Sequence, residues 1–166
     1  MIAPLSLSNV LTVVLAVTCM TTLLAQSSGG VLRMWRLAVP ASCAAVDAMV
    51  LLAGVFDATF LHDAEWLVAG IAGSVVGRMR GAAMMVEADH TRGLVRLPRS
   101  VDGLIVAGVL VIAAFLDFAG AALADPVLEP QHVAAISAFC AGYLGCRALA
   151  MILRAQQAPH VQLRDA

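Results

Sequence analysis

Five long apolar runs, separated by short polar segments, set the pattern of this chain of 166 residues. The runs extend over residues 5–25, 37–56, 64–84, 101–124 and 131–153. Each is close to the 20 or so mostly apolar residues that a helix needs to cross a bilayer. The pattern therefore predicts an all-α membrane protein, a bundle of about five transmembrane helices in one domain (1–154) with a short tail (155–166).

The third run is the least apolar of the five. Its apolar part, Ala64–Val76, is short, and it reaches a spanning length only if the helix continues through Arg78 to about Met84. We expect the arginines to lie at the end of that helix, where long basic side chains reach the membrane surface.

Basic residues occur in every second polar segment. Arg33 and Arg36 follow the first run, and five arginines lie at the end of the third run and in the segment after it. Arg154 follows the fifth run, whereas the segments after the second and fourth runs hold no arginine. Short cytoplasmic loops of membrane proteins are enriched in Lys and Arg. The alternation predicts a multi-pass protein of the bacterial inner membrane, with the N-terminus outside and the C-terminus in the cytoplasm.

The segment after the third run predicts a β-hairpin. The letters "MMVEADHTRGLVRL" give two short strands around a turn at Asp89–Gly93, with Glu87 and Asp89 facing Arg96 and Arg92. A lone hairpin is marginally stable in water, so we expect it to rest on the membrane surface or on a partner. Five arginines of this region either mark the cytoplasmic side or contact anionic lipid or a partner: Arg78, Arg80, Arg92, Arg96 and Arg99.

Composition changes this picture little. The chain is 61% hydrophobic and 13% charged, and a soluble domain carries about twice that charged fraction. A formal net charge of −1 predicts no surface for nucleic acid, so the lipid bilayer is the expected partner. No basic segment precedes the first run, which we therefore interpret as a retained span and not a signal peptide.

One region resembles a known family. A glycine-rich span, then "GRMRG", then the hairpin "VEAD…GLVRLPRS" and a further span are similar to the CcdC-like family of small polytopic membrane proteins. The resemblance covers about residues 70–117. It implies a helical bundle and, through the family's name, a link to cytochrome c biogenesis, but it carries over no catalytic residue.

Three charged residues lie well inside the apolar runs, away from the run ends: Asp47, Asp117 and Arg147. Such residues are costly in a membrane and normally face the bundle and find a partner. From their depths we expect Asp47 to pair with Arg147, and Asp117 to be protonated or hydrogen-bonded to a hydroxyl. Tyr143 lies four residues before Arg147 on the same helix face, either in the same polar seam or in ordinary packing. The group is a substrate, ion or proton site, or else a pair that fixes helix register.

Glycines form a stripe in the third run. Gly73, Gly77 and Gly81 recur every four residues, which lets another helix approach closely. The neighbour is a helix of the same chain, a second copy or a larger membrane partner.

No cofactor is predicted, and two ligand sets remain as alternatives. His62, Glu129 and His132 in the segments without arginine are candidates for a metal site. Cys19, Cys43 and Cys146 share the inner half of the bundle and are candidates for a thiol site that handles metal or heme.

Three functions are consistent with these patterns. The first is a non-catalytic accessory or assembly subunit, which docks on a larger complex or on a second copy through the glycine stripe and the basic loop. The second is a small transporter that uses Asp47, Asp117 and Arg147. The third is a thiol, metal or heme-handling factor in cytochrome biogenesis. No catalytic motif is present, so enzymatic activity is not predicted.

Overall fold

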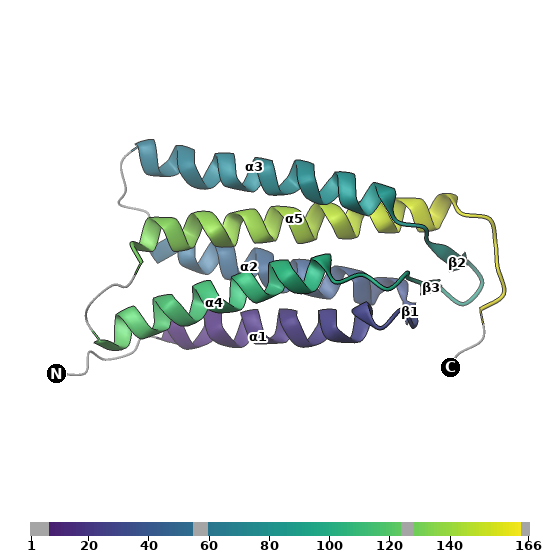
Figure 1. The fold of residues 1–166 in the computed structure, drawn as a ribbon, viewed down its shortest axis with the longest axis horizontal. Coiled ribbons are helices and arrows are strands. Elements are labelled where there is room, and N and C mark those ends of the chain that lie inside the picture. The colour runs from purple at the N-terminus through teal and green to yellow at the C-terminus, as the bar shows by residue number, and fades with distance from the viewer. Residues whose placement is uncertain (1–6, 55–59, 124–127, 164–166) are drawn as a thin grey trace.

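The computed structural model describes residues 7–54, 60–123 and 128–163, and it forms an elongated helical bundle with a small sheet at one end (Figure 1). The helices are α1 (Leu7–Ser27), α2 (Ala38–Gly54), α3 (Phe60–Ala83), α4 (Asp102–Leu123) and α5 (Pro130–Gln157). A short 3-10 helix, η1 (Met34–Leu37), leads into α2. Each helix corresponds to one apolar run of the sequence, so the predicted helical bundle is present.

Four helical segments of the described chain are long and apolar enough to cross a membrane. They are Leu7–Ser27, Met34–Ala53, Asp102–Leu123 and Pro130–Gln157. This supports a membrane protein. The helix α3 is not among them, because Glu65, Arg78 and Arg80 confine its apolar part to the middle of its 24 residues.

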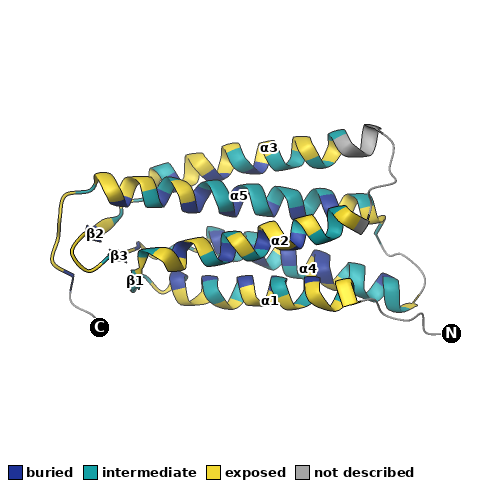
Figure 2. Cartoon of the chain, turned by 180° about the vertical axis from the view of Figure 1, so that it is seen from behind, coloured by how far each residue is buried: buried dark blue, intermediate teal, exposed yellow. Residues whose placement is uncertain are grey.

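The helix α5 holds the bundle together. It packs against α2, α3 and α4, whereas α1 packs against α2 and α4. The attachment of α3 is therefore mainly to α5, on the outer side of the bundle in Figure 1. Figure 2 shows exposed residues along the outward faces of the helices, and many are large and apolar, such as Val14, Ile71 and Ile112. Such an exterior suits contact with lipid.

The glycine stripe of α3 lies against α5. A side-chain carbon on Gly73 or Gly77 would collide with the backbone of Phe139 or Tyr143, and one on Gly81 would lie 2.6 Å from the carbonyl oxygen of Arg147. Each later glycine of α3 meets a later residue of α5. The two helices therefore run parallel and in close contact. The structure thus uses the stripe inside one chain, and α5 occupies the surface that a second copy or a larger partner would need.

The sheet has three antiparallel strands, not the two predicted. The strands β1 (Val31–Arg33), β2 (Glu87–Asp89) and β3 (Leu94–Arg96) lie in the order β1-β3-β2. The predicted hairpin is β2 and β3, with Glu87 opposite Arg96. The additional strand β1 pairs with β3 after a turn in which Gly29 adopts a positive φ of 76°, which glycine tolerates.

The sheet rests on its own chain, so the hairpin is not the lone element expected, and its contact with the membrane surface or a partner stays a prediction. Val95 and Leu97 pack with Leu37, Met151 and Ala155 in a second hydrophobic cluster. This cluster joins the sheet to η1 and to the last turns of α5. The sheet is thereby a cap on one end of the bundle, hereafter the sheet end, and the opposite end is the loop end.

The tail after α5 also folds back onto the hairpin. The Val161 amide donates to the carbonyl of Ala88 at 3.0 Å, and the Leu163 amide donates to Asp89 Oδ2 at 3.3 Å. Leu163 is buried there. The short tail predicted over residues 155–166 therefore continues α5 to Gln157 and then, up to residue 163, lies along the β2 edge of the sheet.

Candidate functional site

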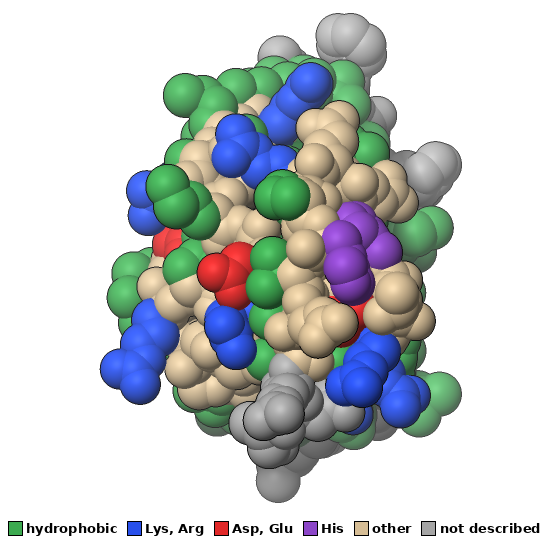
Figure 3. All heavy atoms as spheres, turned by 90° about the vertical axis from the view of Figure 1, so that its right-hand side faces the viewer, with side chains coloured by type: hydrophobic (Ala, Val, Ile, Leu, Met, Phe, Trp, Pro, Cys, Tyr) green, Lys and Arg blue, Asp and Glu red, His purple; other side chains and the backbone are tan. Residues whose placement is uncertain are grey.

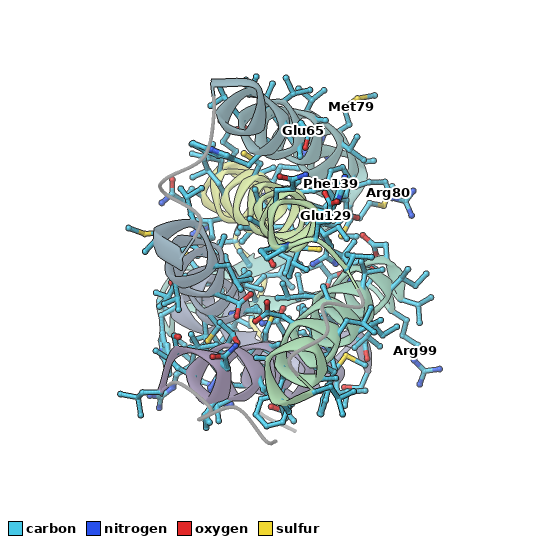
Figure 4. The ribbon with its side chains drawn as sticks, turned by 90° about the vertical axis from the view of Figure 1, so that its left-hand side faces the viewer. Glu65, Met79, Arg80, Arg99, Glu129 and Phe139 are labelled. Carbon is cyan, nitrogen blue, oxygen red and sulfur yellow. The ribbon has the colours of Figure 1, made fainter. Side chains whose placement is uncertain are left out.

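Polar side chains occur inside the bundle at three levels, one near each end and one between them. Together they form a polar seam, defined here by Asp47, Asp102, Asp117, Ser137, Tyr143 and Arg147. Figure 4 looks along the bundle from the loop end and shows the oxygen-bearing side chains between the helices.

At the sheet end, Arg147 is bound to Asp102. Its Nε donates to Asp102 Oδ2 at 3.0 Å, and its Nη2 donates to Ser100 Oγ at 3.1 Å. The Tyr143 hydroxyl donates to the same Oδ2 at 2.7 Å, and the Ser100 hydroxyl donates to Oδ1. Both side chains of the ion pair are nearly buried, at 7% and 13% exposed. The Asp102 carboxylate thus accepts three hydrogen bonds, and the Arg147 guanidinium binds both a carboxylate and a hydroxyl, as a buried ion pair requires.

Local structure explains the choice of carboxylate. Asp102 is the first residue of α4, where the unpaired backbone N–H groups of the helix favour a negative charge. The following residue, Gly103, leaves room for the guanidinium, since a side-chain carbon there would lie 3.3 Å from Arg147 Nη1. A larger residue at position 103 would crowd the ion pair.

The predicted pair between Asp47 and Arg147 is wrong. Arg147 joins Asp102 at the sheet end, and not the more central Asp47. Asp102 was missed because it stands at the border of an apolar run, three residues after Arg99. The predicted common seam of Tyr143 and Arg147 is present, through their shared carboxylate.

In the middle of the bundle, Asp47 of α2 is completely buried and unsatisfied. Its exposed fraction is 0%, and neither carboxyl oxygen makes a hydrogen bond to any described residue. Ser137 of α5 lies close enough to influence the carboxyl, but its hydroxyl oxygen is also buried without a partner among the described residues. Two polar groups from facing helices thus lie near each other without a hydrogen bond of normal geometry.

At the loop end, a pocket of about 130 Å³ opens beside Asp117. Asn9 of α1 donates to Asp117 Oδ2 at 3.3 Å, and buried Thr12 also lines the pocket. The partner of Asp117 is therefore an amide, where a hydroxyl was one expectation. Val50 and Leu51 of α2 also line the pocket, about one helical turn beyond Asp47, which is itself not part of the lining.

Three cysteines surround the middle of the seam. Cys19 lies within electrostatic reach of Cys43, Cys140 and Asp47. The predicted trio contained Cys146 in place of Cys140, and Cys146 instead lines a groove between α3 and α5. The thiols of Cys19 and Cys140 point to backbone carbonyls of Pro40 and Val106, at 3.4 and 3.6 Å, as buried cysteines commonly do.

The structure describes the side chains of two of the three residues predicted as metal ligands. The side chain of His62 lies outside the described residues. Glu129 Oε2 and His132 Nδ1 are 3.7 Å apart on the surface. Within the described ranges, no three His, Cys, Asp or Glu side chains are grouped so as to hold a metal ion.

The five arginines of the loop divide into two sets. Arg96 pairs with Glu87 at 3.1 Å, Arg92 donates to the carbonyl of Leu163 at 3.5 Å, and Arg99 donates to the carbonyl of Ser28 at 3.4 Å. Arg78 and Arg80 lie in the last turns of α3 and are exposed. Figure 3 faces the sheet end and shows basic side chains around its rim.

No protein-family model, curated protein or solved structure matches the chain. The resemblance of residues 70–117 to the CcdC-like family therefore stays a prediction, and the site is interpreted from its own geometry.

Proposed function

We propose that this chain is a small transporter that binds a proton or a small monovalent cation at Asp47 and exchanges it with the loop end through the pocket beside Asp117. The observation that carries the proposal is the complete burial of Asp47, whose carboxyl oxygens make no hydrogen bond of normal geometry to a described residue and have the Ser137 hydroxyl nearby. A bare carboxylate in the middle of a membrane is costly. A proton or a cation on the carboxyl removes that cost, so occupancy and release are the natural chemistry of the site.

The charge of the surroundings favours a cation. Asp117 acts electrostatically on Asp47, and two carboxyls in one bundle attract positive charge. The one arginine of the seam, Arg147, is already neutralised by Asp102. Ser137 and Thr12 add hydroxyl oxygens, which can coordinate a cation or relay a proton.

The path that an ion would take from Asp47 to the cytoplasm is closed at the sheet end. The space beside Arg147 measures only about 10 Å³, which is about the minimum that holds one water molecule. Tyr143, Asp102, Arg147 and Ser100 fill the path between α4 and α5. In this proposal the structure represents a state open toward the loop end, and release on the other side requires that this cluster separate.

The membrane context is part of the proposal. We place the protein in the bacterial inner membrane, with its N-terminus and loop end outside and its sheet end and C-terminus in the cytoplasm, because the arginines gather at the sheet end. In this arrangement α3 is the fifth span, with Arg78 and Arg80 at the cytoplasmic surface.

Proteoliposomes that contain a pH-sensitive dye test the proposal. With an imposed membrane potential, the wild-type protein should acidify or alkalinise the vesicles, and Asp47→Asn and Asp117→Asn should reduce the rate to that of empty vesicles. Glu65→Gln is the matched control, because it removes one carboxylate from the exposed surface of α3. Repeating the assay with sodium and potassium gradients distinguishes these ions from protons. Undiminished flux in Asp47→Asn, or no flux of any of these ions in the wild type, would refute the proposal.

Fewer residues support the alternative function, an accessory subunit of a larger complex. The glycine stripe that would dock on a partner is covered by α5, and three of the five loop arginines contact the chain itself. Co-purification of a larger complex from native membranes, lost on substitution of Arg78 and Arg80, would favour that role over transport.

A further inference from the structure

A groove between α3 and α5 at the sheet end combines charge with an apolar floor. Its volume is about 410 Å³, and its walls include Arg78 and Ala82 from α3 and Leu149, Leu153 and Arg154 from α5. Gln157 lies at the end of the groove nearest the tail. The groove belongs to neither the polar seam nor the loop-end pocket.

The two arginines of the groove differ from four other arginines of the sheet end, and they resemble the exposed Arg33 and Arg36. Arg92, Arg96, Arg99 and Arg147 each bind an oxygen of the chain. Arg78 and Arg154 are exposed, and no ion pair or hydrogen bond of their side chains occurs among the described residues. An acidic residue in the adjoining groove, Glu87, is committed to Arg96. The groove thus offers two positive charges that no described carboxylate balances.

The apolar part continues toward the middle of the bundle. Leu149 and Leu153 are among the exposed large hydrophobic residues, and Cys146 lies one turn further inward along α5. Arg154 is in the last turn of α5, where a spanning helix leaves the membrane. The backbone of Arg78 lies further from the membrane surface than that of Arg154, but its long side chain can extend to the same surface. Charge at the surface and apolar side chains below it match the order of groups in a phospholipid.

We propose that this groove binds one phospholipid with an anionic headgroup. The phosphate lies between the guanidinium groups of Arg78 and Arg154, which present several N–H donors to its oxygens, and the Gln157 amide adds a further donor. One acyl chain follows Leu153 and Leu149 along the interface of α3 and α5. Because α3 is joined mainly to α5, the lipid links these two helices on their open side.

Native mass spectrometry tests the proposal on the full-length protein. The protein is extracted from nanodiscs of phosphatidylcholine that contain phosphatidylglycerol as a minor component, and the lipids that remain bound are identified. We expect one retained phosphatidylglycerol and a stability increase in nanodiscs that contain it. The double variant Arg78→Gln/Arg154→Gln should lower the retained fraction roughly tenfold, since each arginine near a membrane surface contributes appreciably to anionic lipid binding.

A matched variant controls for general surface charge. Arg33→Gln/Arg36→Gln removes two exposed arginines from the same end of the bundle, and it should retain the lipid at the wild-type level. Equal losses in the two double variants, or equal retention of phosphatidylcholine and phosphatidylglycerol by the wild type, would overturn the proposal. So would a stabilisation by inorganic phosphate alone as large as that by phosphatidylglycerol, because it would assign the site to a free anion. These outcomes leave the flux assay of Asp47 unaffected.

Discussion

The two carboxylates of α4 have opposite environments. Asp102, at the start of the helix, accepts hydrogen bonds from Tyr143, Arg147 and Ser100 and lies where the helix dipole favours a negative charge. Asp117, near the other end of the same helix, has one amide donor at 3.3 Å and a pocket beside it. The comparison separates a carboxylate whose partners are complete from one with room beside it, and the proposed exchange depends on the second kind.

The same contrast separates the two ends of the seam. The sheet end binds its one buried arginine fully, and the sheet and tail close over it. Toward the loop end, Asp47 and Ser137 remain unsatisfied within the described chain. Substitutions at the sheet end should therefore reduce stability, whereas substitutions of Asp47 should reduce function.

The largest expected effect is that of Arg147→Gln. It leaves Asp102 nearly buried without its cation, and breaking a buried pair typically costs about 3–5 kcal/mol. Thermal unfolding in detergent should show a large decrease in melting temperature. Arg154→Gln on the same helix is the control and should change stability little in detergent without anionic lipid. Equal melting temperatures for the two variants would show that the ion pair is not structural.

A smaller loss is expected from Gly77→Ala. The added carbon collides with the backbone of Tyr143 and pushes α3 away from α5, and overpacking of this kind costs about 1–3 kcal/mol. Gly108→Ala is the matched control on α4, because a side-chain carbon there meets nothing within 4 Å. If both variants unfold at the same temperature, the close contact of α3 and α5 is refuted.

A local effect of pH is expected at the sheet. The Thr91 hydroxyl, with further donation from the Leu163, Arg92 and Thr91 amides, holds the pKa of Asp89 at about 2, below its ordinary value of 3.8. A group with a lowered pKa stabilises the fold fully above its unfolded pKa, and that contribution is lost as the pH falls through the folded value. Docking of the tail should therefore persist at pH 4 and weaken toward pH 2.

Hydrogen exchange of residues 158–163, measured by quenched-flow labelling at several pH values, checks this expectation. Asp89→Asn should expose the Leu163 amide at every pH, since the acceptor loses its charge, and Glu87→Gln should not. Protection that does not change between pH 4 and pH 2 would contradict the role of Asp89.

Much of the fold could be predicted because local pattern determines it. The apolar runs gave the helices, the spacing of Gly73, Gly77 and Gly81 gave a close-packing face, and the turn at Asp89–Gly93 gave the hairpin with Glu87 opposite Arg96. These features depend on residues within a few positions of one another.

The remainder depends on contacts between distant segments. The strand β1 resembles the end of an apolar run in sequence, and only its pairing with β3 makes it a strand. The tail carries no strand pattern, yet it binds Ala88 and Asp89. Likewise, the partner of Arg147 depended on where α4 begins relative to α5, which no spacing within one helix reveals.

The most direct test of the central claim is the melting temperature of Asp47→Asn, measured on the preparation used for the flux assay. The account predicts a melting temperature equal to or above that of the wild type, because a neutral amide of the same shape replaces an unpaired carboxyl. A decrease comparable to that of Arg147→Gln would show that Asp47 is a structural residue and would contradict its role as the exchange site.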